Sequence, residues 1–220
     1  MAEEKSQFTG SKKYLEKSFL EELNYKIWTT KGARFEADKR LKIKANMSHI
    51  SLATLSAYLI IASLISVYNL NQEDSSENLI GYVVTALSIL VLVVTQYESS
   101  RDYKLRAKMH HDCGLALSDL YDELRIFKTL KNKPTDFEIL HFTKDISKRY
   151  QDTLKRYDNH SPIDYDTFQI SKLNYFEELT EKGIKRIKRK YKWEIYGWYS
   201  IMIVLPPVLI ITYLVIDYFI

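Results

Sequence analysis

The densest set of potential metal ligands in the sequence is the run His110-His111-Asp112-Cys113. Imidazole, thiolate and carboxylate groups are the usual protein ligands of zinc, so the composition of this run suggests a metal site. Consecutive residues on a helix, however, point about 100° apart and cannot all converge on one ion. No second ligand pair accompanies the run, and we expect no metal to be bound.

Enzymatic chemistry finds little support elsewhere in the sequence. There is no glycine-rich phosphate loop and no nucleophile elbow. The paired carboxylates Glu177 and Glu178 are adjacent on a predicted helix and face different ways, which is typical of a solvated surface. The sequence therefore predicts a protein that is not an enzyme and that needs no cofactor.

Small hydroxyl side chains follow one side of each of two apolar stretches. Such stripes can wet a pore once several subunits assemble, or they can be faces where helices pack closely. Both interpretations stay open, and the first requires a homo-oligomer, because one copy has too few helices to enclose a channel. The candidate pore or packing face comprises Ser56, Ser63, Ser66, Thr85, Ser88 and Thr95.

The hydroxyl stripes lie within long segments that lack charged residues. No Lys, Arg, Asp or Glu occurs at 45–72, 78–97 or 195–216. About 20 residues of helix cross a hydrocarbon core of about 30 Å, so each segment is long enough to span a membrane. The third contains Pro206 and Pro207, which are tolerated in a membrane helix when neighbouring groups bond to the freed carbonyls.

Charge around these segments predicts their orientation. Basic residues precede the first span, follow the second and precede the third, whereas the connector at 71–78 has acids and no base. Basic segments stay in the cytoplasm, so we expect the N-terminus inside and the C-terminus outside. The same clustering explains the net charge of +4 by contact with anionic headgroups, which leaves nucleic acid binding as a weak alternative.

Apolar residues at spacings of three and four predict that the remainder is helical. We expect an all-α integral membrane protein with an N-terminal cytoplasmic helix at 1–46, a transmembrane hairpin at 47–97 (spans about 48–70 and 78–97), a cytoplasmic helical domain at 98–194 and a C-terminal transmembrane helix at 195–217. Gly32 is a possible break in the first helix. The second span is expected to continue unbroken toward Lys133, and another helix is expected around Ile170 to Leu179.

Three short segments resemble the SLATT family of two-transmembrane effector domains, which are associated with SMODS nucleotidyltransferases and SLOG sensor domains. These are residues 33–41 (ARFEADKRL), 97–107 (YESSRDYKLRA) and 157–165 (YDNHSPIDY), and the resemblance covers about Arg34 to Tyr165. The C-terminal span is an addition to the two-helix pattern of that family.

The resemblance implies a membrane effector of bacterial antiviral defence, which oligomerises and permeabilises the inner membrane when a partner signals infection. The implied partners are a nucleotide second messenger, a nucleotidyltransferase, a SLOG-domain protein or a reverse transcriptase. The alternative is a non-conducting adaptor or scaffold that recruits a signalling partner. A housekeeping channel or transporter is disfavoured, because no charged residue lies inside a span.

Within the resembling region, polar residues near the membrane exit and in the turn-rich segment are candidates for coupling a signal to the spans. Glu98 and Arg101 could pair and set the angle of the exit, or could be separately solvated. Turn capping is the simpler role for the residues near Pro162. The candidate signal-coupling residues are Arg34, Glu98, Arg101, Tyr157, Asn159, His160, Asp164 and Tyr165.

Overall fold

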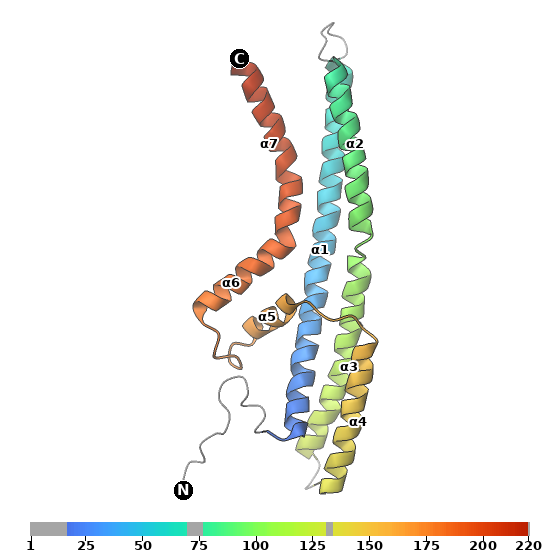
Figure 1. Cartoon of the computed structure of the whole chain (residues 1–220), viewed down its shortest axis with the longest axis vertical. Helices are drawn as coiled ribbons and strands as arrows, with labels where there is room; N and C mark the ends of the chain where they lie inside the picture. Colours follow the sequence, from blue (N-terminus) through green and yellow to red (C-terminus); the bar gives the residue numbers. More distant parts are fainter. Residues whose placement is uncertain (1–16, 70–76, 131–133, 220) are drawn as a thin grey trace. The chain divides into compact units, whose positions relative to one another are not determined.

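The computed structural model describes residues 17–69, 77–130 and 134–219, apart from the side chains of 66, 68, 69, 77–80, 210, 211 and 213–219. This part of the chain is helical and contains no strand, which confirms the predicted all-α class (Figure 1). The elements are α1 (Phe19–Asn69), α2 (Glu77–Ser99), α3 (Tyr103–Leu130), α4 (Asp136–Lys155), α5 (Pro162–Ser171), α6 (Glu181–Lys192), the π-helical turn η2 (Trp193–Gly197) and α7 (Trp198–Phe219).

The chain divides into two compact units. Unit 1 contains the described residues up to Lys39 together with Arg106–Ile187, and unit 2 contains Arg40–Leu105 together with the described residues from Lys188 onward. Helix α1 contributes residues to both units.

The core of unit 1 lies among the N-terminal part of α1, α3 and α4, which run side by side (Figure 1). The apolar residues that recur every third or fourth position on each helix form one stripe, and the stripes meet. The buried members are Leu23, Ile27, Cys113, Leu117, Leu120, Leu124, Ile146 and Tyr150. Phe19, which continues the α1 pattern, is instead 54% exposed.

Gly32 does not break α1, which continues through it. A Cβ atom at this position would lie 2.1–2.6 Å from ring atoms of Phe168, so the glycine lets the α5 ring pack directly on the α1 backbone. Gly114 of α3 similarly leaves room for the Phe35 ring, which would lie 2.9–3.1 Å from an added Cβ atom. Both glycines therefore mark close approaches between helices.

The fourth and fifth helices begin at clear capping residues. Thr135 precedes α4, and its hydroxyl accepts the Glu138 N–H at 3.4 Å while the Glu138 carboxylate accepts the Thr135 N–H at 2.9 Å. Helix α5 starts with Pro162, whose fixed φ suits the first helical position.

The helix expected around Ile170 to Leu179 is wrong beyond Ser171. Residues 172–179 form successive turns, and α6 begins only at Glu181. The apolar side chains of this segment are held by Trp28 of α1 instead: the Phe176 ring stacks on it at 6.0 Å, and Tyr175 tilts against it at 5.1 Å. A tertiary aromatic cluster thus accounts for the hydrophobic spacing.

The expected continuation of the second span into α3 is also wrong. Helix α2 ends at Ser99 and α3 starts at Tyr103. Asp102, immediately before α3, has a φ of 47°, in the left-handed region that cannot be part of a right-handed helix. Asp tolerates this region better than most residues because its short side chain bonds locally.

Among the described residues, two helical regions contain a window that is long and apolar enough to cross a membrane, one within Phe19–Ile65 and one within Gly81–Leu130. Their most apolar windows are only 11% and 6% buried, so their side chains are not the core of a water-soluble bundle. The connector predicted at 71–78 lies largely outside the described residues.

Helix α7 contains both Pro206 and Pro207. Pro207 has no N–H, so the carbonyl of Ile203, four residues earlier, lacks its usual helical donor. The hydroxyl of Tyr58 on α1 donates to that carbonyl at 3.2 Å. Within unit 2, a side chain of the hairpin therefore satisfies a backbone group that the proline leaves free.

Candidate functional site

A charged side chain lies fully buried in unit 1. Arg34 of α1 is 1% exposed, and its Nη1 donates both to the backbone carbonyl of Asp158 and to His110 Nδ1, the latter at 3.2 Å. One guanidinium thus joins α1, α3 and the segment that leads into α5. Burying a charge is expensive unless it is paired and hydrogen-bonded, so the contacts of this group strongly affect the packing of unit 1.

An acid and a second histidine complete this group, which we call the arginine cluster: Arg34, His110, His160, Asp164 and the Asp158 carbonyl. Asp164 is 0% exposed, and its Oδ2 accepts the N–H of Ser161 at 2.9 Å. Its charge acts favourably on the protonated forms of both His110 and His160. Asp164 therefore caps α5, which is the turn-capping role predicted from the sequence. It also supplies the negative charge of the arginine cluster.

Burial and the positive charge of Arg34 keep both histidines neutral. Burial, reinforced by Arg34, lowers the pKa of His110 to about 4, and the same two causes lower the pKa of His160. Asp164 opposes both shifts without reversing them.

The arginine cluster is incompletely hydrogen-bonded. Among the described residues, Arg34 Nε and His160 Nδ1 are buried and have no hydrogen-bond partner. Such groups cost about 1–3 kcal/mol each, and native proteins contain few of them. The arginine cluster therefore carries a cost of burial that its own hydrogen bonds do not offset.

The side chains of Glu98 and Arg101, near the end of α2, do not pair with each other in the described part of unit 2, although the Arg101 N–H donates to the Glu98 carbonyl at 3.2 Å. The Glu98 carboxylate accepts the hydroxyl of Tyr199 on α7 at 2.9 Å and is 5% exposed. Arg101 bonds to the hydroxyl of Tyr97 and lies over its ring. Glu98 thus connects α2 to α7, and the interruption between α2 and α3 ends at Asp102, whose φ is 47°.

The other candidates in the turn-rich segment have different surroundings. Tyr157 packs against the core of unit 1, and Asn159 is exposed. Tyr165 meets the Phe176 ring edge-on at 6.4 Å and hydrogen-bonds to Tyr25, which together with burial raises the pKa of the Tyr25 hydroxyl. Of this segment, only His160 and Asp164 join Arg34.

The hydroxyl stripes do not converge within one chain. Ser63, Thr85, Ser88 and Thr95 each donate to the carbonyl four residues earlier on their own helix, at 2.7–2.9 Å. Ser56, Thr85 and Thr95 are exposed, and the side chain of Ser66 lies outside the described residues. These faces remain candidates for contact with lipid or with another copy.

The run that suggested metal ligands is distributed over three environments. His110 joins the arginine cluster, His111 Nδ1 lies 3.3 Å from Asp38 Oδ2, and Cys113 is buried in the core. Burial raises the pKa of the Cys113 thiol. In the described part of the chain, no group of three His, Cys, Asp or Glu residues is placed to hold a metal.

Sequence reasoning missed the polar contacts between distant segments. His110 was weighed only against its neighbours in sequence, although a histidine on the core side of an amphipathic helix signals a need for a buried partner. Glu194 was also missed: its carboxylate lies 3.2 Å from Arg40 Nη1 and 3.5 Å from Lys44 Nζ within unit 2. The acid stands alone in a basic run, which is the signal that could have found it.

These features define an all-helical membrane protein with two long apolar helices and a buried polar cluster in unit 1. The chain belongs to the SMODS and SLOG-associating 2TM effector domain family 5, whose sequence profile matches residues 16–213. The match reaches most of α7, so that helix falls largely within the matched region. Neither the curated proteins nor the solved structures contain a match to the chain.

Proposed function

We propose that this protein is a triggered effector of bacterial antiviral defence that oligomerises and permeabilises the inner membrane, so that the infected cell stops growing or dies. Its membership in a family of two-transmembrane effector domains supports the general role. The exposed apolar surfaces of α1 and α2 support insertion, and the exposed hydroxyls of Thr85 and Thr95 would supply polar groups between assembled copies.

In this proposal, unit 1 is cytoplasmic and α7 is a third span, with the N-terminus inside and the C-terminus outside. The charge asymmetry of the flanks supports that orientation. The bond from Tyr58 to the Ile203 carbonyl supports a third span, because a freed carbonyl needs a partner within hydrocarbon.

The observation that carries the proposal is the arginine cluster. A buried guanidinium bonded to α3 and to the segment before α5 gives unit 1 a joint whose packing can change when a partner binds. The same helix, α1, carries both Arg34 and the first span. The trigger is a nucleotide second messenger or a partner protein, namely a nucleotidyltransferase, a SLOG-domain protein or a reverse transcriptase, and no catalysis by this chain is involved.

The proposal is tested in cells that carry the gene with its neighbouring genes, by recording membrane potential and dye entry before and after phage challenge. The native chain should depolarise the membrane upon challenge. Arg34→Lys removes the planar guanidinium that reaches both His110 and the Asp158 carbonyl. This variant should either fail to depolarise the membrane upon challenge or depolarise it without challenge. Arg125→Lys on the exposed face of α3 is the matched control and should behave as the native chain does.

The second candidate function is a non-conducting adaptor that recruits a signalling partner. It is favoured by an apolar surface on unit 1, where α3 and α4 expose Ile126, Leu130 and Phe137 by 57%, 75% and 71%. Exposed apolar patches of this kind mark protein interfaces. A protective response with unchanged membrane potential would support the adaptor and contradict permeabilisation.

A further inference from the structure

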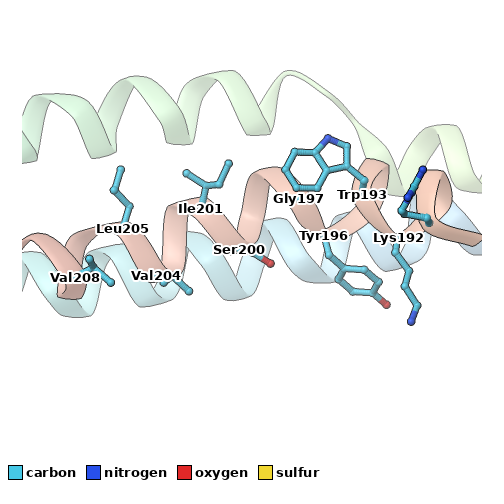
Figure 2. A pocket seen from close by; sticks show the side chains of 10 residues that line it. Lys192, Trp193, Tyr196, Gly197, Ser200, Ile201, Val204, Leu205 and Val208 are labelled. Carbon is cyan, nitrogen blue, oxygen red and sulfur yellow. The ribbon is translucent and has the colours of Figure 1, made fainter.

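A groove runs along one face of the segment that joins α6 to α7. It has a volume of about 620 Å³, and all of its lining residues belong to unit 2. Figure 2 shows two rows of side chains that diverge from the helix, with Trp193, Ile201 and Leu205 on one side and Tyr196, Val204 and Val208 on the other. The floor between the rows is the helix itself.

The groove exists because a small residue interrupts each row. Gly197 stands between Trp193 and Ile201 in the first row, and Ser200 stands between Tyr196 and Val204 in the second. A Cβ atom at Gly197 would lie 3.0–3.2 Å from the indole of Trp193, so the glycine allows that ring to lie close over the helix. The π-helical turn η2 includes both Trp193 and Gly197, and such turns often occur at functional sites.

The chemistry of the groove changes along its length. Arg189 and Lys192 lie at one end and are exposed. Trp193, which is 70% exposed, and Tyr196 follow, and the remainder is lined by aliphatic side chains such as Val204 and Leu205. This order of cation, amphipathic ring and hydrocarbon matches the order of layers from the membrane surface into the bilayer.

We infer that this groove binds one anionic phospholipid of the cytoplasmic leaflet, with its phosphate at Arg189 and Lys192 and an acyl chain between the rows toward Val208. The inference rests on the proposed third span. At 1.5 Å per residue, Lys192 and Val208 are about 24 Å apart along a helix. One leaflet with its headgroup is about 20–22 Å thick, so the groove extends over a single leaflet.

A second copy of the chain is a poorer occupant of this groove. Copies in one membrane are parallel, so pairing through the same face would place Arg189 and Lys192 of one copy beside those of the other. Like charges in contact oppose such pairing. Each nearby cation instead increases the binding constant of an anionic headgroup by about fivefold.

Fluorescence quenching by brominated lipids tests this inference. The full chain carrying Trp198→Phe is placed in nanodiscs, so that Trp193 of η2 is the only tryptophan of unit 2, while Trp28 of unit 1 gives a constant background. Brominated acyl chains are supplied either on phosphatidylglycerol or on phosphatidylcholine over the same range of mole fractions. Quenching at a lower mole fraction reports a preference for the headgroup that carries the bromine.

Half-maximal quenching should need about 25-fold less brominated phosphatidylglycerol than brominated phosphatidylcholine, because Arg189 and Lys192 each contribute about fivefold. The double variant Arg189→Gln/Lys192→Gln should lose this preference, whereas Lys188→Gln/Lys190→Gln, which removes the same charge from positions outside the groove, should keep it. Ser200→Phe, at an exposed position, should fill the groove and also lose the preference.

Each other outcome has a distinct meaning. Equal quenching by both lipids in the parent, or equal loss in the two double variants, would overturn the lipid site while leaving α7 in the bilayer. Absence of quenching by either lipid would instead contradict the third span. Disulfide cross-linking of Ser200→Cys between copies, in a Cys113→Ala background, would assign the groove to a second copy and overturn the inference.

Discussion

At the scale of single residues, the bond between Arg34 and His110 defines a protonation state. A guanidinium can only donate hydrogen bonds, so His110 Nδ1 must accept, and the neutral ring carries its proton on Nε2. Protonation of Nδ1 would place two donors 3.2 Å apart and add a second positive charge to a buried site. The hydrogen-bond geometry and the lowered pKa of His110 therefore both indicate a neutral ring.

This arrangement predicts that unit 1 loses stability as the pH falls. The folded pKa of His110 is about 4, below the unfolded value of 6.5, so the unfolded chain binds more protons between these values. The stability that the neutral ring contributes is complete above 6.5 and is lost on acidification toward 4. We expect a loss on the order of 2 kcal/mol by about pH 5, with His160 adding to it in the same direction.

Urea titrations of the detergent-solubilised protein carrying Trp193→Phe and Trp198→Phe, followed by the fluorescence of the remaining Trp28, measure this dependence. His110→Gln, which retains an acceptor but does not titrate, should weaken the pH dependence, while His141→Gln at an exposed position should leave it unchanged. A stability that stayed constant between about pH 7 and pH 5 would contradict the neutral assignment.

The sequence could predict part of the arginine cluster. Arg34, His160 and Asp164 were identified through the family resemblance, and the structure brings these three together. His110 could not be paired with Arg34, because 76 residues separate them and only the packing of α3 on α1 brings them into contact. For Glu98 and Arg101, proximity in the sequence suggested a side-chain pair that the structure does not contain. Glu98 bonds to Tyr199 instead, and Arg101 bonds to Tyr97.

At the scale of helices, the prediction was good where periodicity dominates and poor where a local breaker or a tertiary contact decides. The apolar spacings of three and four predicted helices in this region, and the structure shows that the apolar residues of α1, α3 and α4 form the core of unit 1. The interruption at Ser100 to Asp102 was missed because no proline or glycine marks it. Gly32 was judged by its intrinsic propensity, whereas its neighbour Phe168 determines its role.

Gly32→Ala should destabilise unit 1 by about 2 kcal/mol, because the added methyl group would overlap the buried Phe168 ring. The same urea titration measures the loss. Gly183→Ala meets only the flexible Thr180 side chain at 3.3 Å and should be neutral. Combining Gly32→Ala with Phe168→Leu should recover part of the loss, and full additivity of the two changes would argue against the contact.

The bond between Tyr58 and the Ile203 carbonyl predicts an interaction that depends on Pro207. Tyr58→Phe should lower the thermal stability of the protein in detergent, by roughly 1 kcal/mol in free energy. In a Pro207→Ala background the restored N–H satisfies the carbonyl, so the same change should cost much less. Tyr196→Phe, an exposed tyrosine of the adjoining turn, serves as control. An equal loss of stability from Tyr58→Phe in both backgrounds would show that the tyrosine does not compensate for the missing N–H of Pro207.

At the scale of the whole molecule, the charge asymmetry predicts which segments face the cytoplasm. In a Cys113→Ala background, Ser75→Cys in the acidic connector should react with a membrane-impermeant maleimide on spheroplasts. Lys182→Cys, at an exposed position of α6, should react only after lysis. Gel-shift labelling with a large maleimide measures both, and labelling of Lys182→Cys on intact spheroplasts would reverse the orientation.

The carbonyl that Pro207 leaves without a helical donor also links the order of synthesis to the maturation of α7. Helix α7 leaves the ribosome after α1, and its Ile203 carbonyl is bonded by the Tyr58 hydroxyl of that earlier helix. If α7 is the proposed third span, the earlier helix α1 therefore acts as a template, so that α7 reaches its bonded state in the bilayer only alongside a segment that was translated before it.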